Sequence, residues 1–219
     1  MKKKTIISIS VILGILLIDQ VLKIWVKTHM YLGEEISIIG NKILLHFIEN
    51  PGMAFGMEFG GEWGKLALSI FRIIAIAALV YYLIKTIKHE NTLFVVCLSL
   101  IIAGATGNLI DSAFYGMIFG ESHWGQIAQI FPEGGGYASF LHGKVVDMFY
   151  CPIINTILPE WVPILGGEKF VFFSPVFNVA DSAITVAIFM MLIFYKKIFK
   201  NTKSKSSLDC ETNVEGENK

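Results

Sequence analysis

The stretch TLFVVCLSLIIAGATGNLID, residues 92–111, indicates the fold class of this chain. Over about 93–110 it is apolar and uncharged, close to the roughly 20 helical residues that cross a hydrocarbon core. It ends on Asn108 and Asp111, three residues apart and therefore on one face of a helix. The stretch predicts a membrane helix that carries polar groups at one end.

Three further apolar stretches have a similar length and character. With the first, they give four predicted spans, at about 5–26, 66–84, 93–110 and 176–195. The composition agrees, because 54% of the 219 residues are hydrophobic and 16% are charged. Soluble domains have about 45–50% apolar and about 25% charged residues. The first stretch continues past Asp19 without a small-residue cleavage pattern, which predicts a retained span rather than a cleaved signal.

Charge and cysteine counts argue against several other classes of protein. Lysines plus arginines equal aspartates plus glutamates at 18 each, so the chain lacks the basic excess of a nucleic-acid binder. The three cysteines, Cys97, Cys151 and Cys210, show no paired spacing, which argues against a disulfide scaffold or a cysteine zinc site. No HExxH pattern occurs, which argues against a metallopeptidase, and no Walker or dinucleotide-binding glycine pattern is present, so no metal and no organic cofactor is expected.

The lysines predict the orientation of the four spans. Ten of them lie on one side of the four-span frame, at residues 2–4, at 85 and 88, and from 196 to 205. By the positive-inside rule that side is cytoplasmic. Both termini are then cytoplasmic, and the outer segments are 27–65 and 112–175. We expect residues 1–200 to form one membrane domain, and the polar residues 201–219 to form a disordered cytoplasmic tail.

Two outer stretches have the character of strands. Residues 36–48 (ISIIGNKILLHFI) carry β-branched and apolar side chains around a Gly-Asn turn, which predicts a hairpin. Residues 144–149 (KVVDMF) follow a glycine-rich turn and predict another strand. We expect this material to lie on the membrane surface and cover the outer ends of the spans.

Asp19 lies in the first predicted span, with Lys23 four residues later on the same helical face. An ionisable residue inside a span costs about 2.5–3.5 kcal/mol on insertion scales and is a functional candidate by default. Two interpretations are open for this pair. It is either a structural ion pair whose lysine extends toward the interface, or it supports a site.

Asn178 and Asp181 open the fourth span with the same spacing that closes the third. Helix capping accounts for Asn178, whereas Asp181 is expected to lie beyond the cap. Asp111 is expected at a helix C-terminus, where the dipole disfavours an anion. A cation or a hydrogen-bond donor is therefore expected beside Asp111.

Asp147 is embedded among apolar residues of the strand-like stretch. Burial there raises the pKa of a carboxyl group. On its own, Asp147 is more typical of a strand end than of a catalyst. With Asp181 on the same side of the membrane, however, it predicts a carboxylate pair that shares one proton. One carboxylate can then activate water while the other polarises a carbonyl.

Taken together, these stretches resemble the lipoprotein signal peptidases, also called signal peptidase II. The matching motifs, in family order, are Asp19 with Lys23, ENPGMAFG at 49–56, GNLID at 107–111, KVVDMF at 144–149 and FNVADSAI at 177–184. The resemblance covers nearly the whole chain apart from the tail. It implies an all-α integral membrane protein of four transmembrane helices, with a small extracytoplasmic β-cradle and a mobile outer helix.

The resemblance also implies an activity and a location. The chain is expected to be an aspartic endopeptidase of the bacterial inner membrane, with its active site toward the outer face. It would cleave diacylglyceryl-modified prolipoproteins before the lipidated cysteine. We expect these substrates and membrane lipid as partners, no nucleic acid, and a monomer.

Carried over residue by residue, the resemblance implies that Asp147 and Asp181 are the catalytic pair. It implies substrate binding or support of the site for Asp19, Lys23, Asn50, Gly52, Asn108, Asp111 and Asn178. For Asn50 and Gly52 this role rests on the resemblance alone.

Two features depart from the family pattern. An arginine usually follows the aspartate of the third-span motif, and this chain has Ser112 there; Lys23 and Lys144 are the candidates to replace its charge. The outer segment is also longer than usual. Its extra residues, 121–142 and 151–173, are expected to form an outer cap or a partner surface.

Two other function classes remain open from the residues themselves. Asp19, Asp111 and Asp181 could line the proton or cation path of a transporter. Alternatively, the long outer segments could bind a partner in a non-enzymatic scaffold. The three carboxylates all lie toward the outer half, which favours a reaction at the interface, and a scaffold leaves them unexplained. The peptidase is therefore the preferred interpretation.

Overall fold

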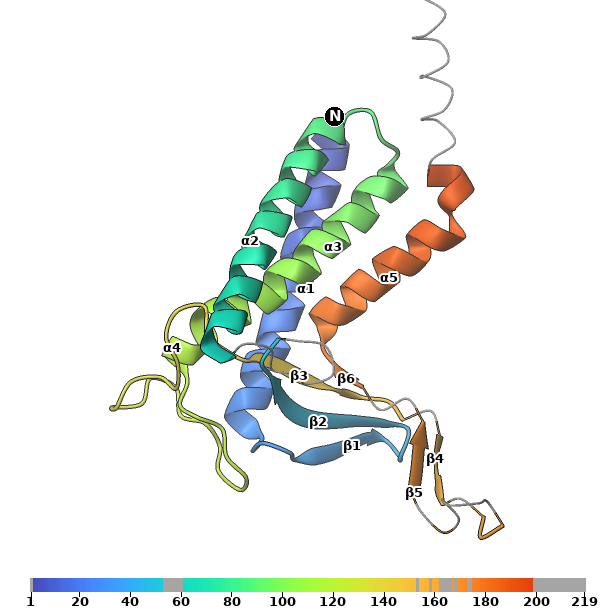
Figure 1. Cartoon of the computed structure of the whole chain (residues 1–219). Coiled ribbons are helices and arrows are strands. Elements are labelled where there is room, and N and C mark those ends of the chain that lie inside the picture. Colours follow the sequence, from blue (N-terminus) through green and yellow to red (C-terminus); the bar gives the residue numbers. More distant parts are fainter. Residues whose placement is uncertain are drawn as a thin grey trace, which may run out of the picture.

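The computed structural model describes residues 2–52, 61–152, 154–157, 159–161, 167, 169–172 and 175–198. The helices are α1 (Lys2–His29), α2 (Gly61–Thr86), α3 (Thr92–Ile110), a π-helical turn η2 (Asp111–Tyr115), α4 (Gly116–Ile118) and α5 (Val179–Ile193). The strands are β1 (Glu35–Ile39), β2 (Ile43–Asn50), β3 (Val145–Tyr150), β4 (Ile154–Ile157), β5 (Lys169–Phe172) and β6 (Val176–Phe177). In Figure 1 the long helices form a bundle, and the sheet lies across one end of it.

Helix α3 is the centre of the bundle, in contact with α1, α2 and α5. Its buried apolar side chains form the core together with Leu83 of α2 and Ala187 of α5. Glycines allow the close approach of its neighbours. A Cβ added at Gly104 would lie 2.3 Å from the backbone oxygen of Ala180 on α5. One added at Gly107 would lie 2.7 Å from an oxygen of Asp19 on α1.

Three helices are long and apolar enough to cross a membrane by length and composition, among the residues described: Lys2–His29, Trp63–Thr86 and Thr92–Ile118. They agree with the first three predicted spans. Helix α5 is apolar but shorter, with 15 residues. It also begins later than predicted, because Val176–Phe177 form β6 and pair with β3. Asn178 then caps the helix, which starts at Val179.

Helix α3 ends at Ile110, as the sequence pattern predicted, but the helical run does not stop there. The chain continues from α3 through η2 into α4, so Asp111 lies within a helical run rather than at its C-terminus. Asp111 and Ser112 are both buried in this π-helical turn. Such turns inside helices occur often at functional sites.

The sheet is antiparallel, with strand order β1-β2-β3-β6. Strands β1 and β2 form the hairpin predicted at 36–48, and Gly40 at the turn has φ +49°. Strand β2 pairs with β3 so that Ile48 lies opposite Asp147 and Asn50 opposite Val145. This pairing brings together Asn50 and Asp147, which are 97 residues apart in sequence.

The two extra outer segments differ in structure. The first, 121–142, packs on the end of the third helix, where the backbone N–H of Ala138 donates to the carbonyl of Gly116 at 2.9 Å. It also contacts the chain after α1 through a bridge between Tyr31 and Ile127. It therefore packs against the end of the bundle where α1 and the third helical run finish. The second, 151–173, contains the separate strand pair β4 and β5.

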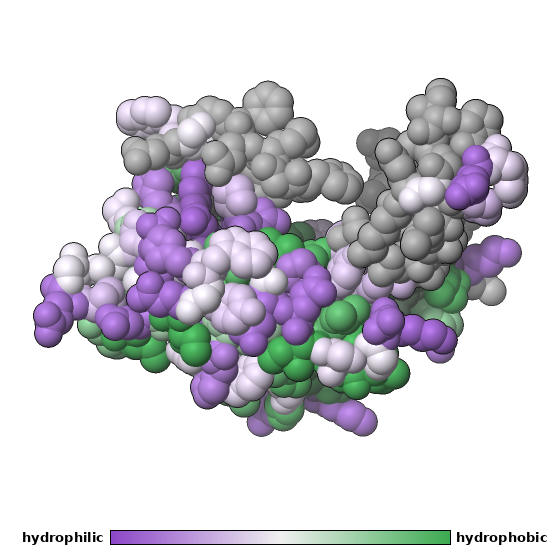
Figure 2. All heavy atoms as spheres, turned by 90° about the horizontal axis from the view of Figure 1, so that it is seen from below, coloured by the Kyte–Doolittle hydropathy of each residue, from purple (hydrophilic) through white to green (hydrophobic). Residues whose placement is uncertain are grey.

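The face that carries the sheet and the outer segments is chemically mixed. Figure 2 views the molecule from that end and shows hydrophilic and hydrophobic residues side by side. The sides of the helices are different, because many of their exposed side chains are large and apolar, including Leu13, Leu17, Phe71, Ile74 and Phe189. Exposed apolar helix sides with a mixed end face fit a bundle surrounded by lipid.

Candidate active site

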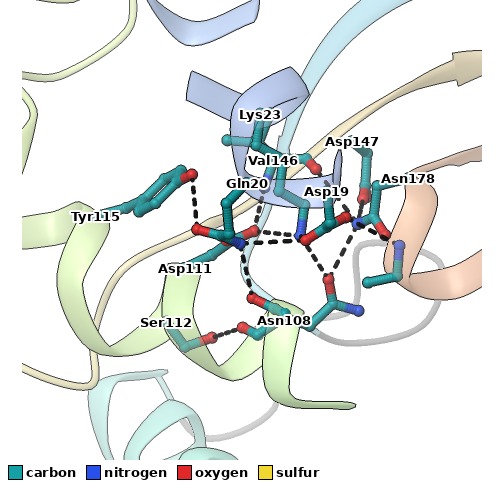
Figure 3. A network of polar contacts seen from close by, with 12 residues as sticks. Asp19, Gln20, Lys23, Asn108, Asp111, Ser112, Tyr115, Val146, Asp147 and Asn178 are labelled. Carbon is teal, nitrogen blue, oxygen red and sulfur yellow. Dashed lines mark hydrogen bonds and ion pairs between the residues drawn. The ribbon is translucent and has the colours of Figure 1, made fainter. Parts of the chain in front are cut away.

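A cluster of buried polar side chains lies where the ends of α1, α3 and α5 meet strand β3, and Figure 3 shows most of it at close range. The chain buries few polar groups elsewhere in its described helices. The buried members of the cluster are Asp19, Lys23, Asn108, Asp111, Ser112, Asp147 and Asn178. All the polar residues that the sequence analysis singled out in the spans are therefore brought to one place.

Lys23 is the centre of the inner part of this cluster. Its Nζ lies 2.9 Å from Oδ2 of Asp19 and 2.7 Å from Oδ2 of Asp111, and all three side chains are 0% exposed. It also donates to Oδ1 of Asn108 at 2.9 Å. The cation expected beside Asp111 is thus Lys23. Of the two interpretations left open for Asp19 and Lys23, the ion pair is present, but Lys23 does not extend toward the interface, because two buried carboxylates hold its charge in the interior.

The same ion cluster connects elements far apart in sequence. Asp19 Oδ1 accepts from the backbone N–H of Ala180 on α5 at 2.9 Å. Asp111 Oδ2 accepts from the backbone N–H of Val146 on β3 at 3.3 Å. Gln20, which the sequence analysis did not single out, donates to Oδ1 of Asp111 at 3.0 Å. Buried charges with partners on every side hold these elements in fixed relative positions.

Asp147 is 4% exposed on β3 and accepts two side-chain hydrogen bonds. Asn178 Nδ2 donates to its Oδ1 at 2.8 Å, and Asn50 Nδ2 donates to its Oδ2 at 3.2 Å. Burial raises the pKa of Asp147 to about 7, and repulsion from the nearby Asp181 carboxylate acts in the same direction. A carboxyl group with this pKa holds a proton for part of the time at neutral pH.

Asp181 is the third residue of α5 and completes a capping box. The Asn178 side chain accepts from the backbone N–H of Asp181 at 2.9 Å, and Asp181 Oδ2 accepts from the backbone N–H of Asn178 at 3.4 Å. The prediction that Asp181 lies beyond the cap is therefore wrong, since a capping box uses this third position. Its other oxygen accepts from Asn108 Nδ2 at 2.8 Å.

Gly52 lies beside the site, at the edge of the described residues. Its backbone N–H donates to Oδ1 of Asn50 at 2.8 Å, and its φ of +98° is one that other residues rarely adopt. Its carbonyl accepts from Nη2 of Arg72 at 2.7 Å. Residues 53–56 of the same motif lie outside the described residues.

Of the two lysines proposed to replace the charge of the missing arginine, Lys23 pairs with Asp111 next to Ser112, but neither lysine bonds Ser112 itself. Nζ of Lys144 lies 3.7 Å from Glu49, and Lys23 is engaged with its two carboxylates. It is Arg72 of α2 that donates to Oγ of Ser112, at 3.2 Å.

Comparison with known proteins places the chain in a family. The family model for signal peptidase (SPase) II matches residues 11–197. This chain belongs to the signal peptidase II family. The lipoprotein signal peptidase of Porphyromonas gingivalis is 54% identical over 190 residues, which cover 86% of this chain and 82% of the relative. That of Amoebophilus asiaticus is 37% identical over 197 residues, which cover 88% and 79%.

Solved structures agree with the fold of this signal peptidase II chain. One bacterial membrane enzyme has a TM-score of 0.56 at 24% identity and covers 87% of each chain. Another has a TM-score of 0.55 at 26% identity and covers 85% of this chain and 90% of its own. A membrane peptidase family fits neither the transporter nor the scaffold interpretation.

A second buried ion pair lies next to the site of this signal peptidase II chain and was also missed. Lys27 of α1 pairs with Glu49 and donates to Oγ of Ser122 at 2.9 Å. Its Nζ lies 5.3 Å from the ring centre of Phe119 and 5.0 Å from that of Tyr137. Through Lys27, Glu49, which precedes Asn50 in sequence, is connected to Ser122 in the segment 121–142.

Metal-ligand types do not cluster in the described part of the chain. No group of three or more histidine, cysteine, aspartate or glutamate side chains there is placed to hold a metal ion. Cys97 and Cys151 are free, and Cys210 lies outside the described residues.

Proposed function

We propose that this chain cleaves diacylglyceryl-modified prolipoproteins before the lipidated cysteine, with Asp147 and Asp181 as its catalytic residues. Removal of signal peptides from prolipoproteins follows from its family and from the relatives named lipoprotein signal peptidase. The aspartic mechanism and its two residues are our proposal, and the geometry of the site supports them.

The observation that carries the proposal is the position of Asn178 between the two carboxylates. Its side-chain NH2 donates to the carboxylate of Asp147. Its side-chain oxygen accepts from the backbone N–H of Asp181, and its own backbone N–H donates to the carboxylate of Asp181. One residue thus fixes both acids, which are close enough for Asp181 to raise the pKa of Asp147. Two acids in this relation share a proton more readily than they ionise together.

The surrounding amides are oriented by the ion cluster. Oδ1 of Asn108 accepts from Lys23 and from Asn178, so its Nδ2 is left to face Asp181. Lys23 therefore fixes which end of the Asn108 amide faces the carboxylate. This arrangement supports roles in site support for Asp19, Lys23, Asn108 and Asp111.

The chemistry follows from one protonated and one ionised acid. The ionised carboxylate takes a proton from water, and the hydroxide adds to the scissile carbonyl carbon, whose oxygen accepts a hydrogen bond from the protonated acid. The C–N bond then breaks, and the leaving nitrogen takes a proton from the acid pair. Which aspartate starts with the proton is a property of the coupled pair.

We place the chain in the bacterial inner membrane with four spans, α5 serving as the fourth. Both termini would be cytoplasmic and the site would face outward, because the lysines at 2–4, 85, 88, 196 and 197 lie at the other end of the helices. Residues 1–200 would act as one monomeric membrane domain, with lipid and the substrate's signal helix beside it. The proposed tail, 201–219, lies outside the described residues.

The experiment is cleavage of a prolipoprotein by the purified full-length chain in detergent, with the products weighed by mass spectrometry. The same precursor without the diacylglyceryl group is the matched control. We expect cleavage of the lipidated precursor alone, with the modified cysteine as the new N-terminus. Equal cleavage of both precursors, or a cut elsewhere, would contradict the proposed specificity.

A further inference from the structure

Arg72 is the only arginine in the chain, and it lies within a helix that is apolar enough to span a membrane. A guanidinium keeps its charge at every physiological pH. Ionisable groups inside a span are costly and mark functional positions. The proposed mechanism gives Arg72 no role, although its contacts point directly at the site.

The guanidinium of Arg72 joins α2 to two other parts of the site. Its Nη2 donates to the carbonyl of Gly52 at 2.7 Å, and its Nη1 donates to Oγ of Ser112 at 3.2 Å. Ser112 Oγ in turn donates to the carbonyl of Asn108 at 3.1 Å. One planar fork thus reaches the turn after β2 and the π-helical turn after α3.

The contact with Gly52 leads to Asp147 in two further hydrogen bonds. The Gly52 N–H donates to Oδ1 of Asn50, which leaves Nδ2 of Asn50 to donate to Asp147. The turn at Gly52 also fits closely against the guanidinium, since a Cβ there would lie 3.1 Å from Nη1 of Arg72. Arg72 is thus connected to the Asn50 amide through Gly52.

The charge of Arg72 also acts on the carboxylates of Asp181, Asp111 and Asp147. Lys23 is already shared between Asp19 and Asp111, and Lys27 and Lys144 face Glu49. The groups that face Asp147 from the elements around it are Asn50 on β2, Asn178 before α5, Asp181 on α5, Lys23 on α1 and Arg72 on α2. Among these, Arg72 is the cation that no carboxylate in the described residues binds directly.

We propose that Arg72 is a positioning residue of the active site, which holds the Asn50–Gly52 turn against Asp147 and supplies the positive charge that keeps one acid of the pair ionised. The inference rests on the proposed roles of Asp147 and Asp181. A merely structural arginine would join α2 to its neighbours and affect stability alone.

Two substitutions separate the charge of Arg72 from its hydrogen bonds. Arg72→Gln keeps a hydrogen-bond donor and removes the positive charge. Arg72→Lys keeps the charge but removes the planar guanidinium that donates from two nitrogens. Lys85→Gln is the matched control, because it removes a cation from the opposite end of the same helix, where Lys85 lies over the ring of Tyr81. Asp147→Asn and Asp181→Asn are measured in the same assay.

The readouts are kcat, KM and the pH dependence of cleavage, with melting temperature as the check on folding. For Arg72→Gln we expect a loss of about 100-fold in kcat. We also expect the acidic limb of the pH profile to move to higher pH, because a lost cation makes each carboxylate harder to ionise. Arg72→Lys should keep the wild-type limb and recover part of kcat, and Lys85→Gln should match wild type.

Each contrary result has one meaning. The inference would be overturned if Arg72→Gln had the wild-type kcat and pH profile. It would also be overturned if Arg72→Gln had a lower kcat but an unmoved acidic limb. In both cases the proposed function would still stand if the two aspartate variants were inactive. If Arg72→Gln does not fold, a limb displaced in Arg72→Lys would equally overturn it. Normal cleavage by Asp147→Asn and Asp181→Asn would instead reject the catalytic pair.

Discussion

The side-chain amide of Asn178 donates to Oδ1 of Asp147 at 2.8 Å, joining the first residue before α5 to the middle of β3. The same residue caps α5 through Asp181. A single asparagine thus carries a structural role and a role in the site, and the two can be separated by experiment.

Asn178→Ala is expected to lower both stability and activity. Loss of the cap costs about 1 kcal/mol in unfolding free energy, and release of both carboxylates is expected to reduce kcat by about 100-fold. Asn91→Ala is the matched control, since Asn91 caps α3 in the same way at the far end of the bundle. Comparable activity losses in the two variants, measured with melting temperatures in detergent, would contradict this account.

Gly52→Ala is expected to lose activity beyond what its backbone strain explains. An alanine at φ +98° is strained by about 1–2 kcal/mol, and its Cβ would push against Arg72. Gly135→Ala carries the same strain at φ +84° with nothing within 4 Å. Both variants should melt at lower temperatures, but only Gly52→Ala should show a lower kcat. Equal kcat values would mean that the turn at Gly52 does not position the site.

Lys23→Met is expected to destabilise the protein severely. It leaves Asp19 and Asp111 buried without a cation, which costs about 3–5 kcal/mol of unfolding free energy. Adding Asp111→Asn should recover part of the loss, because it removes one of the unpaired charges. Thermal unfolding of the single and double variants tests this. A double variant less stable than Lys23→Met would show that the ion cluster is not the source of the loss.

The fold was largely predictable, since hydropathy gives the long helices, and β-branched and apolar residues near turn glycines give the hairpin and β3. That the polar residues of the spans gather together was predictable too, because each buried charge in a span demands a partner. The sequence pattern does not reveal which partner, since the pairing of β2 with β3 and the packing of α3 against α5 are long-range. Only those contacts bring Asn50, Asn108 and Asn178 to the two acids.

Two features were missed although their signals are present in the sequence. Arg72 is a lone arginine inside a predicted span, and the rule applied to Asp19 applies to it equally. The Asn178–Asp181 spacing is that of a capping box, which accounts for both residues. The burial of Lys27 has no local signal, because its partner Glu49 lies on another element, and the second partner of Lys23, Asp111, lies on another element too.

The stability of the protein is expected to depend on Asp147 in a defined pH range. Its folded-state pKa is about 7, above the ordinary 3.8, so the folded chain binds more protons than the unfolded chain between these values. Stability from this group therefore falls as pH rises from about 4 to about 7. Asp147→Asn removes that loss, so its melting temperature relative to wild type should rise across this range. A constant difference across the range would contradict the raised pKa.

The most direct test of the catalytic pair is the initial rate of cleavage of a diacylglyceryl-modified prolipoprotein by Asp147→Asn and by Asp181→Asn. Asp209→Asn, in the segment 201–219, is the matched control. We predict that both site variants lose at least about 1000-fold in rate while remaining folded, and that the control equals wild type. Cleavage near the wild-type rate by either folded site variant would contradict the assignment of Asp147 and Asp181 as the catalytic pair.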